Sequence, residues 1–319
     1  MPTAKKVLLT GANGFIGKHL IDQIPLHWDL VAAVRSDKAK IDIQQSGKKL
    51  DVVSVGNLSE ETDWGEALTG VDAVVHLAGR AHQTDEDPSQ SLDLFRRMNC
   101  SASVNLLKQA ARSGAKRFIY MSSIGVIGNV SGVKPFNEAT QCNPVAAYAQ
   151  SKLEAESSLT ALAEELGIEL VIIRPPLVYG CNAPGNFGKL TKLVALMPVL
   201  PFGLVNNKKS FISIENLVDF IEVCISHPKA ANELFVIADE DVISTKVLTN
   251  HIAASLNKSV FQFPFPVSVF QWFLRTVGKE SLAIQLFDDL EVDITKARTL
   301  LSWQPKASTE KSMQKLLGS

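Results

Sequence analysis

The sequence predicts an α/β fold built on a doubly wound parallel sheet, followed by a smaller mixed α/β lobe. Short runs rich in Val, Ile and Leu alternate with helical periodicity between residues 6 and 180. This is the pattern of βαβ units in a parallel sheet covered on both faces. A glycine-rich turn joins the first strand to its helix. We expect one domain over residues 1–180, to which some later segments return, and a second lobe over 181–319.

The glycines of the first turn are three residues apart. Glycine lets the backbone curl tightly, approach a ligand closely and pack the following helix against the strand. The free amides and the dipole of that helix then favour an anion. The turn predicts a pyrophosphate site for a dinucleotide, and a tight turn without a ligand is the alternative. The residues concerned are Gly11, Asn13, Gly14, Phe15, Ile16 and Gly17.

The second strand, residues 30–34, ends at Arg35. A carboxylate at this place would hold the ribose hydroxyl of NAD, whereas an arginine suits the additional phosphate of NADP. Arg35 therefore favours NADP(H). NAD(H) is the alternative, because Asp37 is close enough in sequence to reach the ribose. After a third strand at 52–55, Asn57 and Leu58 are expected beside the adenine ring.

A fourth buried strand lies within residues 72–79 and ends in Leu77, Ala78 and Gly79. Small side chains there would let a planar ligand lie against the backbone. His76 precedes this turn within an apolar run, and a core histidine is the preferred interpretation. A helix follows over residues 91–113. Asn99 in its middle is either a surface residue or a buried amide with backbone partners.

Candidate catalytic residues follow the fifth strand, residues 117–122. Ser122 and Ser123 end this strand at the carboxyl edge, where open α/β sheets bind ligands. Tyr148 and Lys152 begin the next helix, and their spacing places both on one face. A lysine charge about 5 Å from the phenol contributes about 3 kcal/mol at an effective dielectric of ~20. We therefore expect Lys152 to lower the pKa of Tyr148 and make it a proton carrier.

Composition excludes several classes of function. The net charge of −1 and the lack of Lys/Arg clusters with aromatics give no footprint for nucleic acid. The four cysteines are scattered without metal-ligand spacing, which favours reduced thiols in the cytoplasm and no metal site. The first strand begins too early to leave room for a signal peptide. Prolines interrupt the apolar stretches 193–205 and 260–274, so no membrane span is expected.

Together these motifs resemble the extended short-chain dehydrogenase/reductases, a Rossmann family that includes nucleotide-sugar epimerases, dehydratases and 4-keto reductases. The resemblance covers almost the whole chain and also rests on residues 174–180 and 292–297. It implies that Ser123 binds the substrate oxygen, with Ser122 as the fallback. It also implies that Tyr148 exchanges a proton and that Lys152 holds the nicotinamide ribose. Asn99, Tyr148, Pro175 and Val178 are also implied near the cofactor.

In this family the second lobe binds the nucleotide diphosphate of the substrate. Asn186, Phe187 and Lys209 resemble its substrate-binding residues. The alternatives are that Asn186 caps a helix and that Lys209 is solvated. The resemblance also implies a homodimer formed through the helices that begin near Ser91 and Tyr148.

The resemblance favours NADPH-dependent reduction of a UDP-4-keto-6-deoxy-N-acetylhexose for surface polysaccharide, as in UDP-N-acetylquinovosamine-type 4-keto reductases. A UDP-glucose or UDP-N-acetylglucosamine 4-epimerase with tightly bound NAD is the alternative, and a non-catalytic regulator is a distant one. Dehydration is disfavoured because Ile124 and Gly125 offer no carboxylate. The aromatic run over 261–273 is assigned to core packing, with a subunit or peripheral membrane surface as alternatives.

Overall fold

The computed structural model describes residues 5–23, 25, 28–44, 50–80 and 88–316. The chain divides into two compact units. Unit 1 consists of residues 1–126, 142–174 and 218–235, and unit 2 of residues 127–141, 175–217 and 236–319. The division therefore does not follow a single boundary near residue 180, because each unit takes a segment from the other part of the chain.

Unit 1 carries a seven-stranded sheet in the order β10-β6-β5-β4-β1-β2-β3. Parallel pairing is continuous from β6 to β3. The strands are β1 (Lys6–Thr10), β2 (Asp29–Val34), β3 (Asp51–Ser54), β4 (Ala73–His76), β5 (Arg117–Met121), β6 (Glu169–Arg174) and β10 (Glu233–Val236). The order confirms the predicted doubly wound sheet, because β1 lies inside the sheet between β4 and β2 and the chain winds outward from it in both directions.

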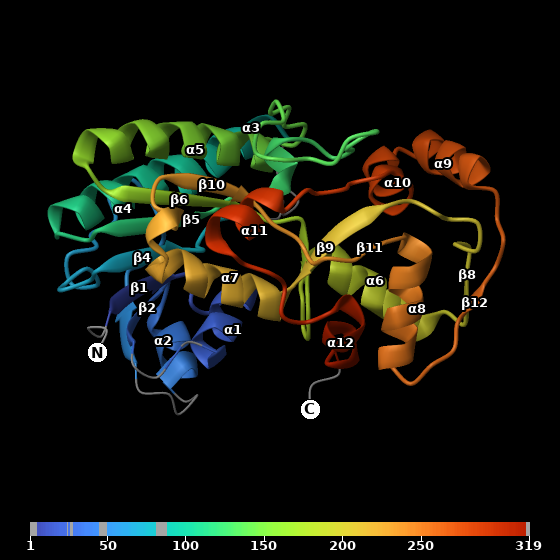
Figure 1. Ribbon diagram of the computed structural model, residues 1–319, viewed down its shortest axis with the longest axis horizontal. Helices are drawn as coiled ribbons and strands as arrows, with labels where there is room; N and C mark the ends of the chain where they lie inside the picture. Colours follow the sequence, from blue (N-terminus) through green and yellow to red (C-terminus); the bar gives the residue numbers. More distant parts are fainter. Residues whose placement is uncertain (1–4, 24, 26–27, 45–49, 81–87, 317–319) are drawn as a thin grey trace. The chain divides into compact units, whose positions relative to one another are not determined.

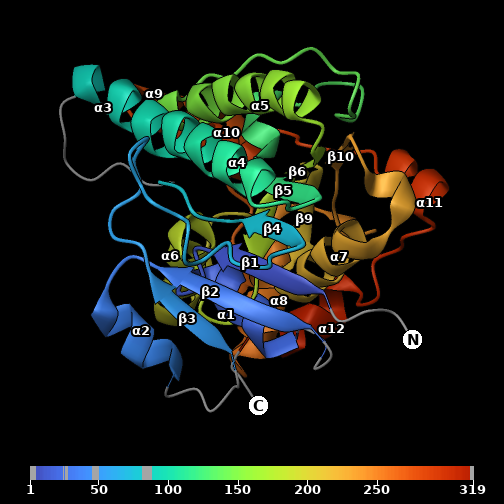
Figure 2. The same cartoon turned by 90° about the vertical axis from the view of Figure 1, so that its left-hand side faces the viewer.

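Helices cover both faces of this sheet (Figure 2). The long α4 and α5 lie on one face, and α1 and α2 on the other. The helices of unit 1 are α1 (Phe15–Gln23), α2 (Asp37–Gln44), α3 (Pro88–Arg96), α4 (Ala102–Arg112) and α5 (Ala147–Leu166), joined by most of α7 (Ile214–Ser226). Short turns occur at η2 (Ile124–Val126) and η3 (Pro228–Ala230). The core between layers is apolar and includes fully buried Leu8, Val74, Phe118 and Leu159.

The single helix expected over 91–113 is interrupted by η1, a π-helical turn at Arg97–Ser101. A π turn inserts an extra residue into the helical ladder and is frequent at functional sites. Asn99 lies inside it and is fully buried. Of the two interpretations that the sequence left open for Asn99, the surface residue is wrong and the buried amide is confirmed.

Unit 2 is a mixed α/β assembly (Figure 1). Its three-stranded sheet has the order β11-β9-β7, with β9 parallel to β7 and antiparallel to β11. The strands are β7 (Leu177–Tyr179), β9 (Lys209–Ser213) and β11 (Val242–Ile243), and a second pair consists of β8 (Val199–Leu200) and β12 (Phe261–Gln262). The helices are α6 (Gly185–Leu196), α8 (Thr245–Ser255), α9 (Val267–Thr276), α10 (Glu280–Phe287), α11 (Thr295–Leu301) and α12 (Thr309–Gln314).

Candidate active site

The glycine turn after β1 is built by close backbone contacts. Gly11 has φ +70°, and a Cβ there would lie 2.9 Å from the backbone nitrogen of Ala78. A Cβ on Gly17 would lie 2.3 Å from the carbonyl oxygen of Gly11. The Gly14 amide donates to the same carbonyl oxygen at 2.9 Å. Side chains at Gly11 and Gly17 would therefore force the turn apart, so both positions need glycine.

A cavity of about 240 Å³ opens beside this turn. Its wall comes from the ends of β1, β2, β3 and β4, as expected at the carboxyl edge of a parallel sheet. Most of the predicted cofactor residues of unit 1 share it: Gly11, Asn13, Gly14, Arg35, Leu58, Leu77, Ala78 and Gly79. Trp64 and Met98 also line it, and sequence reasoning did not find them. The other predicted cofactor residues of unit 1 lie outside its lining: Phe15, Ile16, Gly17, Asn57, Asn99, Tyr148 and Lys152.

Asn99 fastens the segment after β4 to helix α5. Its amide nitrogen donates to Arg80 O at 3.1 Å and to Ser151 Oγ at 3.0 Å, and its Oδ1 accepts from the Arg80 amide at 2.8 Å. Because every polar atom of this buried side chain is bonded, its desolvation is compensated. The π turn thus fixes the position of the loop that includes Gly79 relative to α5.

His76 belongs to the same buried layer. Its Nδ1 lies 2.7 Å from Thr10 Oγ1 and its Nε2 lies 2.8 Å from Ser103 Oγ. Burial lowers its pKa to about 3, and the charge of Lys152 acts in the same direction. The ring is therefore neutral at physiological pH and serves as a bridge between β1, β4 and α4. These contacts agree with a core histidine.

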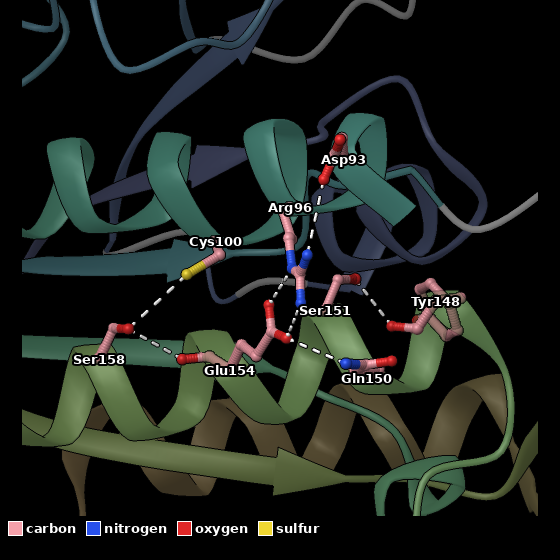
Figure 3. A network of polar contacts seen from close by, with 8 residues as sticks. All are labelled: Asp93, Arg96, Cys100, Tyr148, Gln150, Ser151, Glu154 and Ser158. Carbon is pink, nitrogen blue, oxygen red and sulfur yellow. Dashed lines mark hydrogen bonds and ion pairs between the residues drawn. The ribbon is translucent and has the colours of Figure 1, made fainter. Parts of the chain in front are cut away.

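The first turns of α5 carry Tyr148 and Lys152 (Figure 3 shows Tyr148 at this end of the helix). Lys152 is buried, and its Nζ donates to Met121 O at the end of β5 at 2.8 Å. Burial lowers its pKa to about 8, although Glu156 opposes this shift. Tyr148 is half-buried, and its ring lies edge-on to Phe95 at 6.1 Å.

Burial raises the pKa of Tyr148 to about 12. The pKa of Tyr148 is therefore raised in this structure, not lowered as expected. Desolvation disfavours the phenolate, while the Lys152 ammonium is directed to the carbonyl of Met121. The phenol therefore holds its proton at neutral pH and can donate it.

The two serines after β5 have different surroundings. Ser122 is buried, and its hydroxyl donates to the Glu156 carboxylate. Ser123 is half-buried, and its Oγ accepts a 3.1 Å bond from the Gly125 amide. Because Ser122 is already engaged, Ser123 is the hydroxyl of this pair that is better placed to meet a ligand.

Glu156 was not found by sequence reasoning, although it follows Lys152 by one helical turn. Both of its carboxylate oxygens accept from Arg174, at 3.0 and 2.5 Å. Between Lys152 and Glu156 on α5, Glu154 forms a partly exposed ion pair with Arg96 at 2.7 Å and so ties the helix to α3 (Figure 3). Contacts with Asn99, Arg174 and Arg96 thus hold this helix in place, in addition to the bond from Lys152 to Met121.

The remaining predicted residues belong to unit 2. Pro175 is buried just before β7, and Val178 pairs with Ile212 across β7 and β9. Asn186 is exposed in the first turn of α6, but Pro184 occupies the N-cap, so the helix-cap interpretation is wrong. Phe187 is buried with its ring 5.8 Å from that of Tyr179.

Lys209 is also buried rather than solvated, contrary to the alternative expectation. Its Nζ lies 3.5 Å from Ile284 O, and burial lowers its pKa to about 8. The nearby carboxylates of Asp288 and Asp289 oppose this shift.

Comparison with known proteins shows the family of this chain. The model of the NAD dependent epimerase/dehydratase family matches residues 7–238. The chain belongs to this family. A protein of Vibrio cholerae named UDP-glucose 4-epimerase is 38% identical over 314 residues, covering 97% of this chain and 94% of that protein. This epimerase/dehydratase family member is accordingly an NAD(P)-dependent enzyme.

Two less similar proteins are also named 4-epimerases, with different named substrates. An Escherichia coli O157:H7 protein named N-acetyl-alpha-D-glucosaminyl-diphospho-ditrans,octacis-undecaprenol 4-epimerase is 28% identical, covering 82% of this chain and 76% of that protein. UDP-glucuronic acid 4-epimerase from Bacillus cereus, solved with NAD, has a TM-score of 0.75 at 21% identity, covering 97% and 96% of the two chains. At that identity the likeness shows the shared fold.

Proposed function

We propose that this enzyme transfers a hydride at C4 of a UDP-linked sugar and that its net reaction is epimerisation at that carbon. The observation that carries the proposal is the placement of Tyr148 and Lys152 on the first turns of α5, with Lys152 bonded to the end of β5 just before Ser123. The 38% identical relative named UDP-glucose 4-epimerase supports this outcome. The order of preference from the sequence, with the reductase first, is therefore reversed.

A nicotinamide dinucleotide suits the cavity beside β1. Gly11 and Ala78 both line this cavity, and a Cβ at position 11 would collide with the backbone of Ala78, so glycine is needed to form this part of the wall. When bound, the dinucleotide supplies the acceptance and return of the hydride. Gly11, Gly14 and the start of α1 would hold its pyrophosphate. Asn57 and Leu58 after β3, and Leu77 to Gly79 after β4, would lie along the rest of it.

Tyr148 manages the proton in this proposal. With a pKa of about 12 it stays protonated at neutral pH and can donate to the C4 oxygen of a 4-keto group as charge develops there. Lys152, with a pKa of about 8, is mostly charged at neutral pH and stabilises the phenolate that remains. Ser123 donates its hydroxyl to the same substrate oxygen. Removal of the proton from a C4 hydroxyl uses the same groups in reverse.

In unit 2, Asn186, Phe187 and Lys209 are assigned to the UDP portion of the substrate. Lys209 supports this assignment, because a buried ammonium whose pKa is lowered by desolvation is stabilised when a diphosphate approaches. Pro175 and Val178 are assigned to the nicotinamide end of the cofactor.

The second candidate is net reduction of a UDP-4-keto-6-deoxy-N-acetylhexose by NADPH. Arg35 favours it, because this exposed arginine lines the cofactor cavity at the end of β2, where a 2′-phosphate would lie. A reductase must exchange its cofactor at each turnover, whereas an epimerase retains it.

The homodimer expected through α3 and α5 stays a prediction, and light scattering of the purified protein tests it.

One experiment separates the two reactions. Purified protein is incubated with UDP-glucose or UDP-N-acetylglucosamine without added cofactor, and separately with the 4-keto sugar nucleotide and NADPH. Appearance of the C4 epimer in the first incubation supports the epimerase. Stoichiometric NADPH oxidation in the second, with no epimer in the first, supports the reductase and contradicts our first choice. Absence of both reactions would contradict chemistry at C4 altogether.

A further inference from the structure

Helix α9 exposes an apolar face. Val269, Trp272 and Phe273 are separated by three and four residues and therefore share one side of the helix. Their exposed fractions are 49%, 66% and 52%. The opposite side is packed, since Leu274 is 6% exposed and the Phe270 ring lies 5.2 Å from that of Phe287. A helix at the surface of a globular protein normally presents polar residues outward, so the orientation of α9 calls for a partner.

A second exposed apolar group lies on the paired strands β8 and β12. Phe261 and Phe263 are 63% and 47% exposed, and Val199, which pairs with Phe261, is 44% exposed. Ring contacts connect this pair to α9: the Phe263 ring lies 6.5 Å from the Phe265 ring in a tilted arrangement, and the Phe265 ring lies edge-on to the Phe270 ring at 5.9 Å. We call these exposed residues of α9, β8 and β12 the aromatic surface. The ring contacts hold it on a rigid base.

The charged residues in the chain segments that carry the aromatic surface are all basic, and Asp288 and Glu280 lie at its edge, beside Gln271 and Arg275 of α9. Residues 183–214 and 242–279, which contain α6, β8, β12 and α9, include no Asp or Glu but eight Lys or Arg. The whole chain, by contrast, has 33 acidic and 32 basic residues. Six of the eight are exposed: Lys189, Lys192, Lys208, Lys258, Arg275 and Lys279. The acidic partners recorded for them are Glu280, 3.9 Å from Arg275, and Glu291, 3.4 Å from Lys208.

We propose that the aromatic surface docks on a lipid bilayer that contains anionic phospholipids. Exposed Trp and Phe suit the interface between headgroups and acyl chains, and surrounding cations are attracted by anionic lipid. A second copy is the poorer partner, because two-fold pairing would bring one basic surface against the same surface. None of the helices in the described part of the chain is long and apolar enough to cross a membrane. The contact is therefore peripheral, and it does not depend on which sugar reaction takes place.

Vesicle flotation tests the docking. We expect the purified full chain to float with vesicles of phosphatidylcholine and phosphatidylglycerol, to float poorly with phosphatidylcholine alone, and to detach as salt screens the charges. The double variant Trp272→Ser/Phe273→Ser should lose at least about tenfold in partitioning, because it removes two interfacial aromatic side chains. The variant Arg275→Glu/Lys279→Glu should lose more than about tenfold, since each basic residue near an anionic surface contributes roughly fivefold.

Val133→Ser is the matched control, because Val133 is fully exposed in unit 2 but lies on none of the elements of the aromatic surface. It should float like the wild type. Thermal unfolding shows whether each variant folds, and the charge-reversal variant tests the proposal independently should the aromatic one unfold. Absence of flotation by the wild type overturns the proposal, as does equal flotation of the folded variants. A dimer by light scattering that only the Trp272/Phe273 variant abolishes would assign the surface to a second copy instead.

Discussion

Arg174 and Glu156 form a bidentate ion pair in which each side chain is 5% exposed. Glu156 lies on α5 one turn after Lys152, Arg174 ends β6, and the hydroxyl of Ser122 at the end of β5 donates to the same carboxylate. The pair therefore fixes the proposed catalytic helix against the carboxyl edge of the sheet. A buried pair whose hydrogen bonds are satisfied can hold this geometry, whereas loss of one partner leaves an uncompensated charge.

The substitution Glu156→Gln should lower the free energy of unfolding by about 3 kcal/mol, because it leaves the buried Arg174 without a countercharge. Urea denaturation measures this. Glu154→Gln on the same helix is the control: its pair with Arg96 is partly exposed, at 33% and 42%, so we expect a loss of at most about 1 kcal/mol. Equal losses for the two variants would show that burial does not account for the contribution of the Arg174–Glu156 pair to the free energy of unfolding.

Replacement of Arg35 by Asp should weaken NADPH binding at least about tenfold more than NADH binding, because a charged hydrogen-bond partner of the phosphate is replaced by a like charge. Binding titrations with both cofactors measure the difference. Lys38→Asp makes the same charge reversal on an exposed residue of α2 outside the cavity lining. It should leave the ratio unchanged. A parallel loss for NADPH and NADH in the Arg35 variant would remove the argument for NADP.

Tyr148→Phe should reduce turnover by about a hundredfold to ten-thousandfold, the usual contribution of a general acid-base group. Fold stability should change little, since no hydrogen bond of the phenol is recorded among the described residues. Turnover and cofactor binding are measured together, and cofactor binding should persist.

Ser122→Ala and Ser123→Ala provide a paired comparison. Ser122→Ala should mainly lower stability, whereas Ser123→Ala should mainly lower turnover; the reverse result would reassign the substrate hydroxyl.

Turnover should fall as pH rises through about 8, because Lys152 loses its proton there and its charge no longer stabilises the phenolate. Stability changes in the opposite direction: the unfolded lysine binds its proton up to about pH 10.4, so raising the pH between these values favours the folded state. Initial rates and urea midpoints across this range check both signs. A rate that stays flat through this range, in an enzyme whose chemical step is rate-limiting, would contradict the assigned role of Lys152.

The sequence by itself determined the parallel strands, the glycine turn and the Tyr148–Lys152 spacing. These are local properties: runs of apolar residues specify buried strands, the glycine spacing specifies a turn in which Gly17 lies against the carbonyl of Gly11, and four-residue spacing specifies one helix face. Their physical cause lies within a few neighbouring residues.

Only the tertiary structure decided which serine is already bonded, which way the pKa of Tyr148 shifts, and that Asn99 lies in a buried π turn. Each depends on groups far apart in the chain. Glu156 engages Ser122 across 34 residues, and Asn99 bonds Ser151 across 52. Desolvation likewise depends on all the groups packed around a side chain. The four-residue spacing of Lys152 from Tyr148 therefore did not decide the direction in which the pKa of Tyr148 shifts.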